Sequence, residues 1–342
     1  MNVTENFSPI ARFVLISAAT VIVVAGIKSA STILAPVLMA VFISIVCSAP
    51  LFALQRRGIP NWVALGIILG IVGLAGLAIF SLMASSVDEF SRSLPRYRLN
   101  LTQLYNQMTA RLGDWGVTLP MQGIQEQLQP DSFITMLNYM LNGLSNILAD
   151  GLVVFLAVFF ILTDVAGLPE KLNAILRNPE ESVGRLSVFI EKVIHYLALK
   201  AATSALTGVC VALILWVLDI DYVFLWAILA FFLNFIPYVG SILAGLPPVL
   251  LAMVDHGWVT AVWAISGYVA INIIVGNIIE TRWMGDGLNL SSFVVFVSLI
   301  FWGWVLGPAG MFLSIPLTML IVIALESSPD SQVIARLMQN RH

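Results

Sequence analysis

The chain has 342 residues, of which 59% are hydrophobic and only 10% are charged, whereas soluble domains carry about 25% charged residues. Sixteen Lys and Arg residues against nineteen Asp and Glu residues leave a formal net charge of −3, which excludes a basic face for nucleic acid. The composition therefore predicts an all-α integral membrane protein, since an apolar helix satisfies its own backbone hydrogen bonds inside a bilayer.

Apolar runs follow one another along almost the whole chain. Eight of them are predicted as full transmembrane helices, at residues 12–27, 33–54, 62–84, 151–163, 195–218, 258–279, 290–305 and 309–325. The N-terminus does not resemble a cleaved signal, because Glu5 lies in its polar start and the first apolar run continues past Lys28 into the second. We interpret that first run as a membrane span.

One further apolar stretch, residues 222–254, is uncharged but broken in the middle. As an unbroken helix it would measure roughly 50 Å, well beyond a bilayer core of about 30 Å. Pro237 removes a backbone donor and clashes with the preceding turn, so the helix must stop or kink there. We predict a broken hairpin of two half-length helices. Backbone freed in this way must be buried in protein or line a watery cavity, which indicates a transport pathway.

Charge in the short loops predicts the orientation. With the N-terminus inside, eleven Lys and Arg residues fall on the cytoplasmic side, and Lys28 alone falls in a short outer loop. Both termini are therefore expected in the cytoplasm. Residues Asn178 and Pro179, followed by two acids, form a helix start. We expect this surface helix to run directly into the span that contains Lys200.

These features divide the chain into six segments. We assign three N-terminal spans (1–84), an extracytoplasmic helical segment (85–145), a membrane span (146–164), a cytoplasmic amphipathic helix (165–192), a C-terminal membrane domain with the broken hairpin (193–325) and a cytoplasmic tail (326–342).

Motifs for catalysis are nearly absent. The sequence has no phosphate-binding loop of the Gly-x-x-x-x-Gly-Lys type and no serine in a nucleophile elbow. His195, His256 and His342 are scattered without the spacing of zinc ligands. Cys47 and Cys210 lie inside apolar runs, where a free thiol behaves as a small hydrophobe. We therefore expect no enzyme activity, no cofactor and no metal.

Polar side chains concentrate in the later apolar segments. Uncharged polar groups in lipid need partners, either across a helix interface or along a water-filled path. For any single asparagine the helix interface is at least as good an explanation, but the cluster around the break favours a pathway. Lys200 is expected to extend towards the interface, and Glu280 to pair with Arg282. The candidate pathway residues are Asn234, Pro237, Tyr238, Gly240, Ser241, Asn272, Asn277, Glu280 and Lys200.

Three strings carry a resemblance to a known family. They are Asn234-Phe235-Ile236-Pro237-Tyr238-Val239-Gly240-Ser241, then Gly276-Asn277-Ile278-Ile279-Glu280 with Met284-Gly285, and Trp302-Gly303-Trp304-Val305-Leu306-Gly307-Pro308-Ala309-Gly310-Met311. Together with the order of the spans, they resemble the autoinducer-2 exporter family, also called PerM-like permeases, and in particular its TqsA-type branch. One departure is Thr281, where the family usually has proline.

The resemblance implies export of the quorum-sensing signal autoinducer-2, or in other branches sodium (lithium)/proton antiport, by a homo-oligomer such as a pentamer in the bacterial inner membrane. Autoinducer-2 is small, polar and largely neutral, and hydroxyl groups need hydrogen bonds rather than a counter-charge. Antiport would require a carboxylate deep in the membrane, whereas the acidic residues here cluster near predicted span ends. Export is therefore favoured over antiport. A non-transporting membrane scaffold is the third alternative, and the break at Pro237 argues against it.

Overall fold

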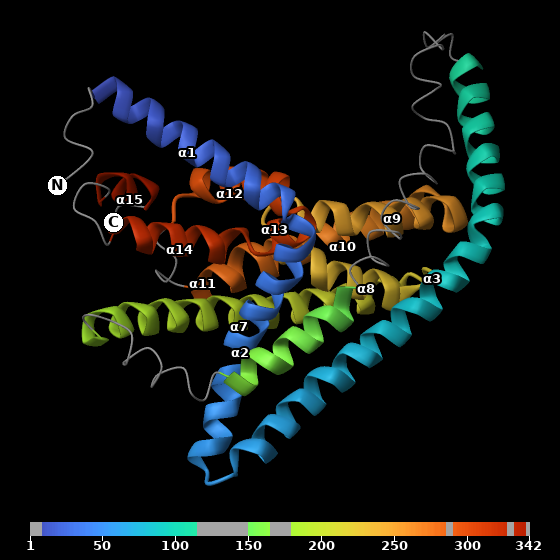
Figure 1. The fold of residues 1–342 in the computed structure, drawn as a ribbon. Helices are drawn as coiled ribbons and strands as arrows, with labels where there is room; N and C mark the ends of the chain where they lie inside the picture. Colours follow the sequence, from blue (N-terminus) through green and yellow to red (C-terminus); the bar gives the residue numbers. More distant parts are fainter. Residues whose placement is uncertain (1–8, 115–149, 165–178, 285–289, 327–331, 340–342) are drawn as a thin grey trace. The chain divides into compact units, whose positions relative to one another are not determined.

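The computed structural model describes residues 9–114, 150–164, 179–284, 290–326 and 332–339 (Figure 1). These residues are almost entirely helical, and their one β contact is an isolated bridge between Leu290 and Gln339. The predicted all-α fold is confirmed. The chain divides into two compact units. The first comprises Met1–Ile45, Leu156–Ile190 and Asn289–His342, and the second comprises Val46–Phe155 and Glu191–Leu288.

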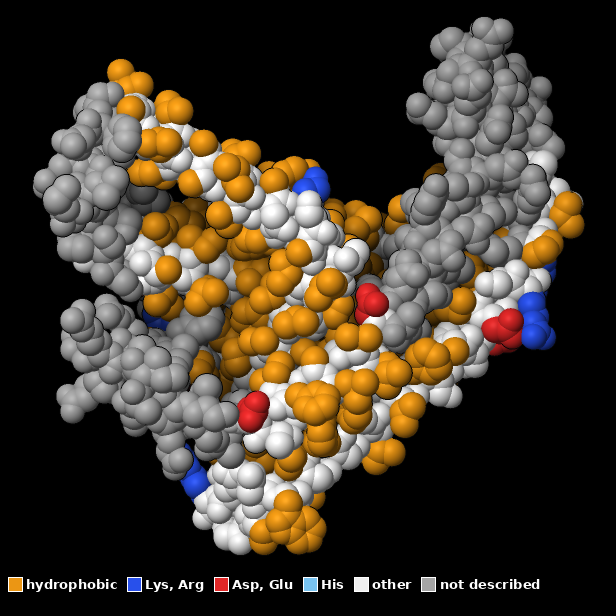
Figure 2. Space-filling model, viewed as in Figure 1, with side chains coloured by type: hydrophobic (Ala, Val, Ile, Leu, Met, Phe, Trp, Pro, Cys, Tyr) orange, Lys and Arg blue, Asp and Glu red, His pale blue; other side chains and the backbone are white. Residues whose placement is uncertain are grey.

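Several described helices have the length and composition of membrane spans. Four are long and apolar enough to cross a bilayer: Ser31–Arg56, Asn61–Ser93, Ile190–Val217 and Trp258–Trp283. Shorter apolar helices cover Val14–Ser29, Val223–Leu233, Gly240–His256, Ser292–Leu306 and Ser314–Glu326, and residues 150–164 are also helical. Hydrophobic side chains dominate the face of the described helices in Figure 2, with few charged groups among them. Lipid-facing helices require such a surface.

The first unit is built around the C-terminal helices. It contains α1 (Pro9–Ser29), the first part of α2 (Ser31–Arg56), α12 (Ser292–Leu306), α13 (Pro308–Phe312), α14 (Ser314–Glu326) and α15 (Gln332–Met338). α12 packs against α1 and α14, and the indole Nε1 of Trp302 donates to Thr318 Oγ1 at 3.1 Å. Gly307 ends α12 with φ 68°, which favours glycine, and Pro308 opens α13.

The second unit holds the broken hairpin. It contains α3 (Asn61–Asp114), the later part of α7 (Pro179–Val217), α8 (Val223–Leu233), α9 (Gly240–His256), α10 (Trp258–Ile271), the π-helix η1 (Asn272–Ile279) and α11 (Glu280–Met284). α9 packs against both α8 and α10, and α3 contacts α8 and α9. The core between these helices is apolar and includes Leu215, Leu225, Trp226 and Ala261.

Two helices extend beyond the span ends that the sequence predicted. α3 does not stop at residue 84 but continues as one helix through Pro95 to Asp114, so the segment expected to be extracytoplasmic begins inside a helix. α7 starts at Pro179 and continues to Val217. The prediction that one helix continues from Pro179 through Lys200 is therefore confirmed.

Candidate functional site

The predicted break in the hairpin is present between α8 and α9. α8 ends at Leu233, α9 begins at Gly240, and Tyr238 adopts a left-handed conformation with φ 63°. The freed backbone is satisfied locally: the Ile236 N–H donates to the Leu233 carbonyl at 2.8 Å, and the Gly240 N–H to the Ile236 carbonyl at 3.2 Å. Because Pro237 lacks a backbone donor, this compact turn replaces helical hydrogen bonding.

Gly240 allows the two helix ends to approach closely. A Cβ atom at this position would lie 1.8 Å from the Leu233 carbonyl oxygen and 2.7 Å from the Leu233 carbonyl carbon. These neighbours are backbone atoms and cannot swing aside as a side chain would. Glycine is thus required at residue 240 by close packing, since its φ is not positive.

Polar side chains meet in a small recess beside the break. Asn234 Nδ2 donates to Ser204 Oγ of α7 at 3.0 Å. A cavity of about 10 Å³ lies next to this bond, and its lining includes Thr207, Ser241, Tyr268, Asn272 and Gly276 as well as Asn234. The Tyr268 hydroxyl is buried and has no hydrogen-bond partner among the described residues. We call this polar-lined cavity the recess.

The recess combines predicted residues with others that the sequence analysis missed. Asn234, Ser241 and Asn272 were predicted, and the structure brings them together. Thr207 and Tyr268 were missed. Tyr268 lies one turn before Asn272, and Thr207 lies one turn after Ser204, so helical spacing alone places each pair on a common face. That spacing was the available signal.

Six of the nine predicted residues do not line the recess: Pro237, Tyr238, Gly240, Asn277, Lys200 and Glu280. Tyr238 is 60% exposed, and Pro237 contributes through the turn rather than as a lining group. Asn277 is exposed on η1, and its carbonyl accepts from Thr281 Oγ1. Helix α11 continues through Thr281. The helix is therefore unbroken at the position where the resembled family usually has proline.

Lys200 and Glu280 form a buried ion pair. Lys200 Nζ lies 2.6 Å from Glu280 Oε1, and the two side chains are 6% and 16% exposed. Thr203 Oγ1 lies 3.5 Å from the second carboxylate oxygen. Two predictions are therefore wrong: Lys200 does not extend to an interface, and Glu280 does not pair with Arg282. Residues two apart on a helix do not face each other, whereas α7 presents Lys200 directly to the carboxylate.

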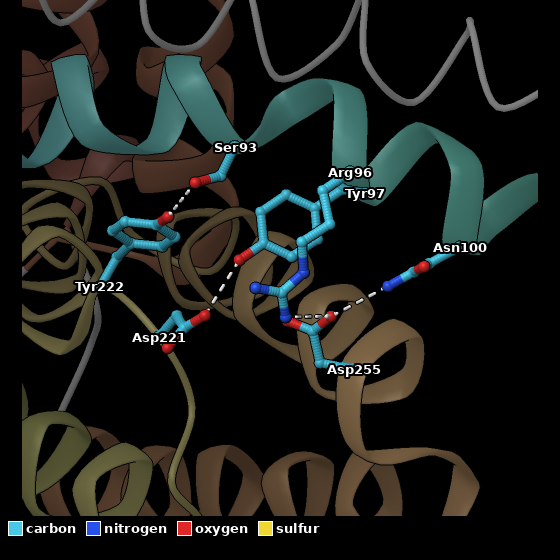
Figure 3. Close-up of polar contacts among 7 residues, drawn as sticks. All are labelled: Ser93, Arg96, Tyr97, Asn100, Asp221, Tyr222 and Asp255. Carbon is cyan, nitrogen blue, oxygen red and sulfur yellow. Dashed lines mark hydrogen bonds and ion pairs between the residues drawn. The ribbon is translucent and has the colours of Figure 1, made fainter.

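The opposite end of the hairpin is held by α3, as Figure 3 shows. Tyr97 Oη donates to Asp221 Oδ2 at 3.1 Å, and Tyr222 Oη donates to Ser93 Oγ at 2.7 Å, just before α8 begins. At the end of α9, Asp255 Oδ1 accepts from Arg96 at 3.5 Å and from Asn100 at 3.4 Å. One stretch of α3 therefore contacts both the start of α8 and the end of α9, which together form the base of the hairpin.

The environment of Tyr97 keeps this contact in place. Burial raises the pKa of Tyr97, and the neighbouring Tyr222 hydroxyl and the carboxylates of Asp255 and Asp221 raise it further. Because its pKa is raised, the phenol remains a hydrogen-bond donor to higher pH than an exposed tyrosine would. Phe90 packs edge-on against Tyr222 and Trp226, so both polar and aromatic contacts fix the start of α8.

We expect Gly240→Ala to destabilise the protein by about 3 kcal/mol or more, because the added methyl group overlaps backbone that cannot move away. Thermal unfolding of the detergent-solubilised protein measures the effect. Gly70→Ala is the matched control, since a Cβ atom there meets nothing within 4 Å and alanine favours helix. Equal unfolding temperatures for the two variants would contradict the role of Gly240.

We expect Lys200→Met and Glu280→Met each to destabilise the protein by about 3–5 kcal/mol, because each leaves one charge buried without its partner. The double variant should recover most of this loss, since two apolar side chains of similar size leave no charge to desolvate. Unfolding of the four proteins gives the coupling energy directly. Additive losses in the double variant would show that the two groups act independently.

Comparison with known proteins identifies the family. The profile of the AI-2E family transporter matches residues 15–330. The AI-2 transport protein TqsA of Escherichia coli (strain K12) is 36% identical over 96% of each chain. A candidate transport protein of Haemophilus influenzae is 36% identical over 98% of each chain, and the candidate permease PerM of Escherichia coli (strain K12) is 25% identical over 92% of this chain and 93% of its own. The chain therefore belongs to the AI-2E transporter family and is a multi-pass membrane transporter.

Proposed function

We propose that this transporter exports a small neutral polar solute, autoinducer-2 or a molecule like it, across the bacterial inner membrane. The observation that carries the proposal is the recess beside the helix break, where Asn234 meets Ser204 and the Tyr268 hydroxyl has no partner within the described part of the chain. Transporters bind their solutes at discontinuous helices of this kind. The name of the relative TqsA supports the choice of solute.

The chemistry of the recess suits a neutral solute better than an ion. Its polar lining residues are Thr207, Asn234, Ser241, Tyr268 and Asn272, which offer hydroxyl and amide groups. These groups both donate and accept hydrogen bonds, as the hydroxyl groups of a small solute require. Each bond contributes only about 0.5–1.5 kcal/mol net, so several together still permit release.

The recess is closed in this structure. Its volume of about 10 Å³ has room for about one water molecule, so a solute of several heavy atoms requires the tip of the hairpin to move. Asn234 holds that tip to α7 through a single hydrogen bond to Ser204. We propose that separation of Asn234 from Ser204 opens the recess to solute.

A sodium (lithium)/proton antiporter is the alternative function. Glu280 is the carboxylate that such a mechanism would use, because it is mostly buried next to η1. However, Lys200 already neutralises it at 2.6 Å, and an incoming cation would have to displace that ammonium group. The pairing therefore supports export over antiport.

We expect Asn234→Leu to reduce export of autoinducer-2 by at least about tenfold, because it removes one polar group of the recess and leaves the Ser204 hydroxyl without its partner. Accumulation of the signal inside and outside cells that lack or over-express the chain measures the effect. Tyr238→Phe is the control, since this exposed side chain does not line the recess. Unchanged export by Asn234→Leu, at equal membrane levels of protein, would exclude the recess as the path.

The same variants separate export from antiport. Glu280→Gln keeps a hydrogen-bonding group beside Lys200 but removes the carboxylate, and we expect it to retain more export than Asn234→Leu. Sodium- or lithium-driven proton movement in proteoliposomes, present in the unmodified chain and lost in Glu280→Gln, would instead establish the antiporter.

We also propose that both termini are cytoplasmic, which places Arg92 outside and Arg57 inside. Both residues are exposed in the structure. Cysteine at position 92 should react with a membrane-impermeant thiol reagent in intact cells, and cysteine at position 57 only after the membrane is permeabilised. Reversed labelling would invert the orientation.

A further inference from the structure

A groove on the second unit runs between α9 and α10 and ends at the recess. Its volume is about 300 Å³, at the lower end of the range for small-molecule sites, whereas the recess holds about one water molecule. Ser241, Tyr268 and Asn272 line both the groove and the recess. A ligand of several heavy atoms therefore fits in the groove and can reach the polar groups of the recess from there.

The groove is polar at one end and apolar at the other. α10 returns along α9 after Gly257, so Ser241 and Asn272 face each other at one end, and Val249 and Ile265 lie at the other. The distance from residue 241 to residue 249 along α9 is about 12 Å at 1.5 Å per residue, enough for a small head group followed by a tail of about eight carbons. All the lining residues are uncharged.

The polar end contains a buried group that lacks a partner. The Tyr268 hydroxyl is buried without a hydrogen bond, and its ring packs on Gly245, where an added Cβ would lie 3.1 Å from ring carbon Cδ1. Glycine at residue 245 thus lets the ring settle against α9. Because a buried hydroxyl without a partner is costly, a head-group hydroxyl small enough to enter the adjoining recess and supply one gains affinity there.

We propose that the groove binds a neutral amphiphile, with a hydrogen-bonding head group at Ser241, Tyr268 and Asn272 and an apolar tail of about eight carbons towards Val249 and Ile265. This inference rests on the proposed function in one respect: the head group lies at the mouth of the export recess. An ionised head group is disfavoured, since it would be buried against a lining that offers no opposite charge. The exposed apolar side chains Ile242 and Val269 line the groove next to the head-group end.

The test is photolabelling of the full-length protein in nanodiscs. The probe is 1-octanoylglycerol with a diazirine at the end of its tail, and mass spectrometry maps the labelled peptides. We expect saturable labelling of α9 and α10 near Val249 and Ile265, competed by unlabelled 1-octanoylglycerol. Val269→Trp should reduce labelling about tenfold by filling the groove. Val262→Trp is the matched control on α10, because these valines are 52% and 54% exposed and Val262 does not line the groove.

Two further variants test binding in the groove independently. Ile242→Trp blocks the groove from the α9 side and should reduce labelling as Val269→Trp does. Either variant therefore suffices if the other folds poorly. Tyr268→Phe should raise the probe concentration needed for half-saturation about threefold to tenfold, because the head-group hydrogen bond is lost. Equal labelling in Val269→Trp and Val262→Trp would overturn the inference. The inference would also be overturned if a phosphatidylcholine probe with the same tail labelled the groove equally and 1-octanoylglycerol failed to displace it. Bulk lipid would then fill the groove.

Binding and export are read separately. A chain that exports autoinducer-2 but shows no saturable labelling overturns the amphiphile site and leaves the proposed function intact. Saturable labelling in a chain that exports no autoinducer-2 supports the site and overturns the proposed solute.

Discussion

The second unit depends on one constraint: backbone released at Pro237 lies within an apolar helix bundle and still needs hydrogen-bond partners. The chain meets this need locally, through the bonds from Ile236 to Leu233 and from Gly240 to Ile236. That solution brings the start of α9 against the Leu233 carbonyl, so closely that residue 240 tolerates no side chain. The turn is consequently short, and Asn234 and Ser241 on its two sides reach a common cavity.

The two ends of the hairpin are held by very different contacts. At the base, α3 engages Asp221, Tyr222 and Asp255 with several hydrogen bonds, supported by aromatic packing around Phe90. At the tip, Asn234 makes one hydrogen bond to α7. A single hydrogen bond contributes only about 0.5–1.5 kcal/mol net, so polar contacts hold the tip less firmly than the base, while the buried Phe235 and Ile236 pack the tip in place.

The features that the sequence predicted are those set by local chemistry. Proline at 237 removes a backbone donor in an uncharged apolar stretch that is too long for one membrane helix, so the broken hairpin and the all-α fold were predictable. The partner of Glu280 was not, because Lys200 is 80 residues away in sequence and only tertiary packing brings them together. Tyr268 likewise has the appearance of an ordinary apolar helix residue, and its missing hydrogen bond is visible only once its neighbours are known.

The ion pair and the recess lie along one polar seam between α7 and the α10–η1–α11 segment. On α7, Lys200 is followed at helical spacing by Ser204 and Thr207, which puts the three residues on one face. On the other side, Glu280 meets Lys200, while Asn272 and Gly276 line the recess with Thr207. The seam thus carries opposite charges that cancel at one end and neutral hydrogen-bonding groups at the other. An ion entering it would have to compete with a pair already formed, whereas a neutral solute needs only to replace the bond between Asn234 and Ser204. For this reason the seam supports the proposed neutral solute even though it contains a buried lysine and a mostly buried glutamate.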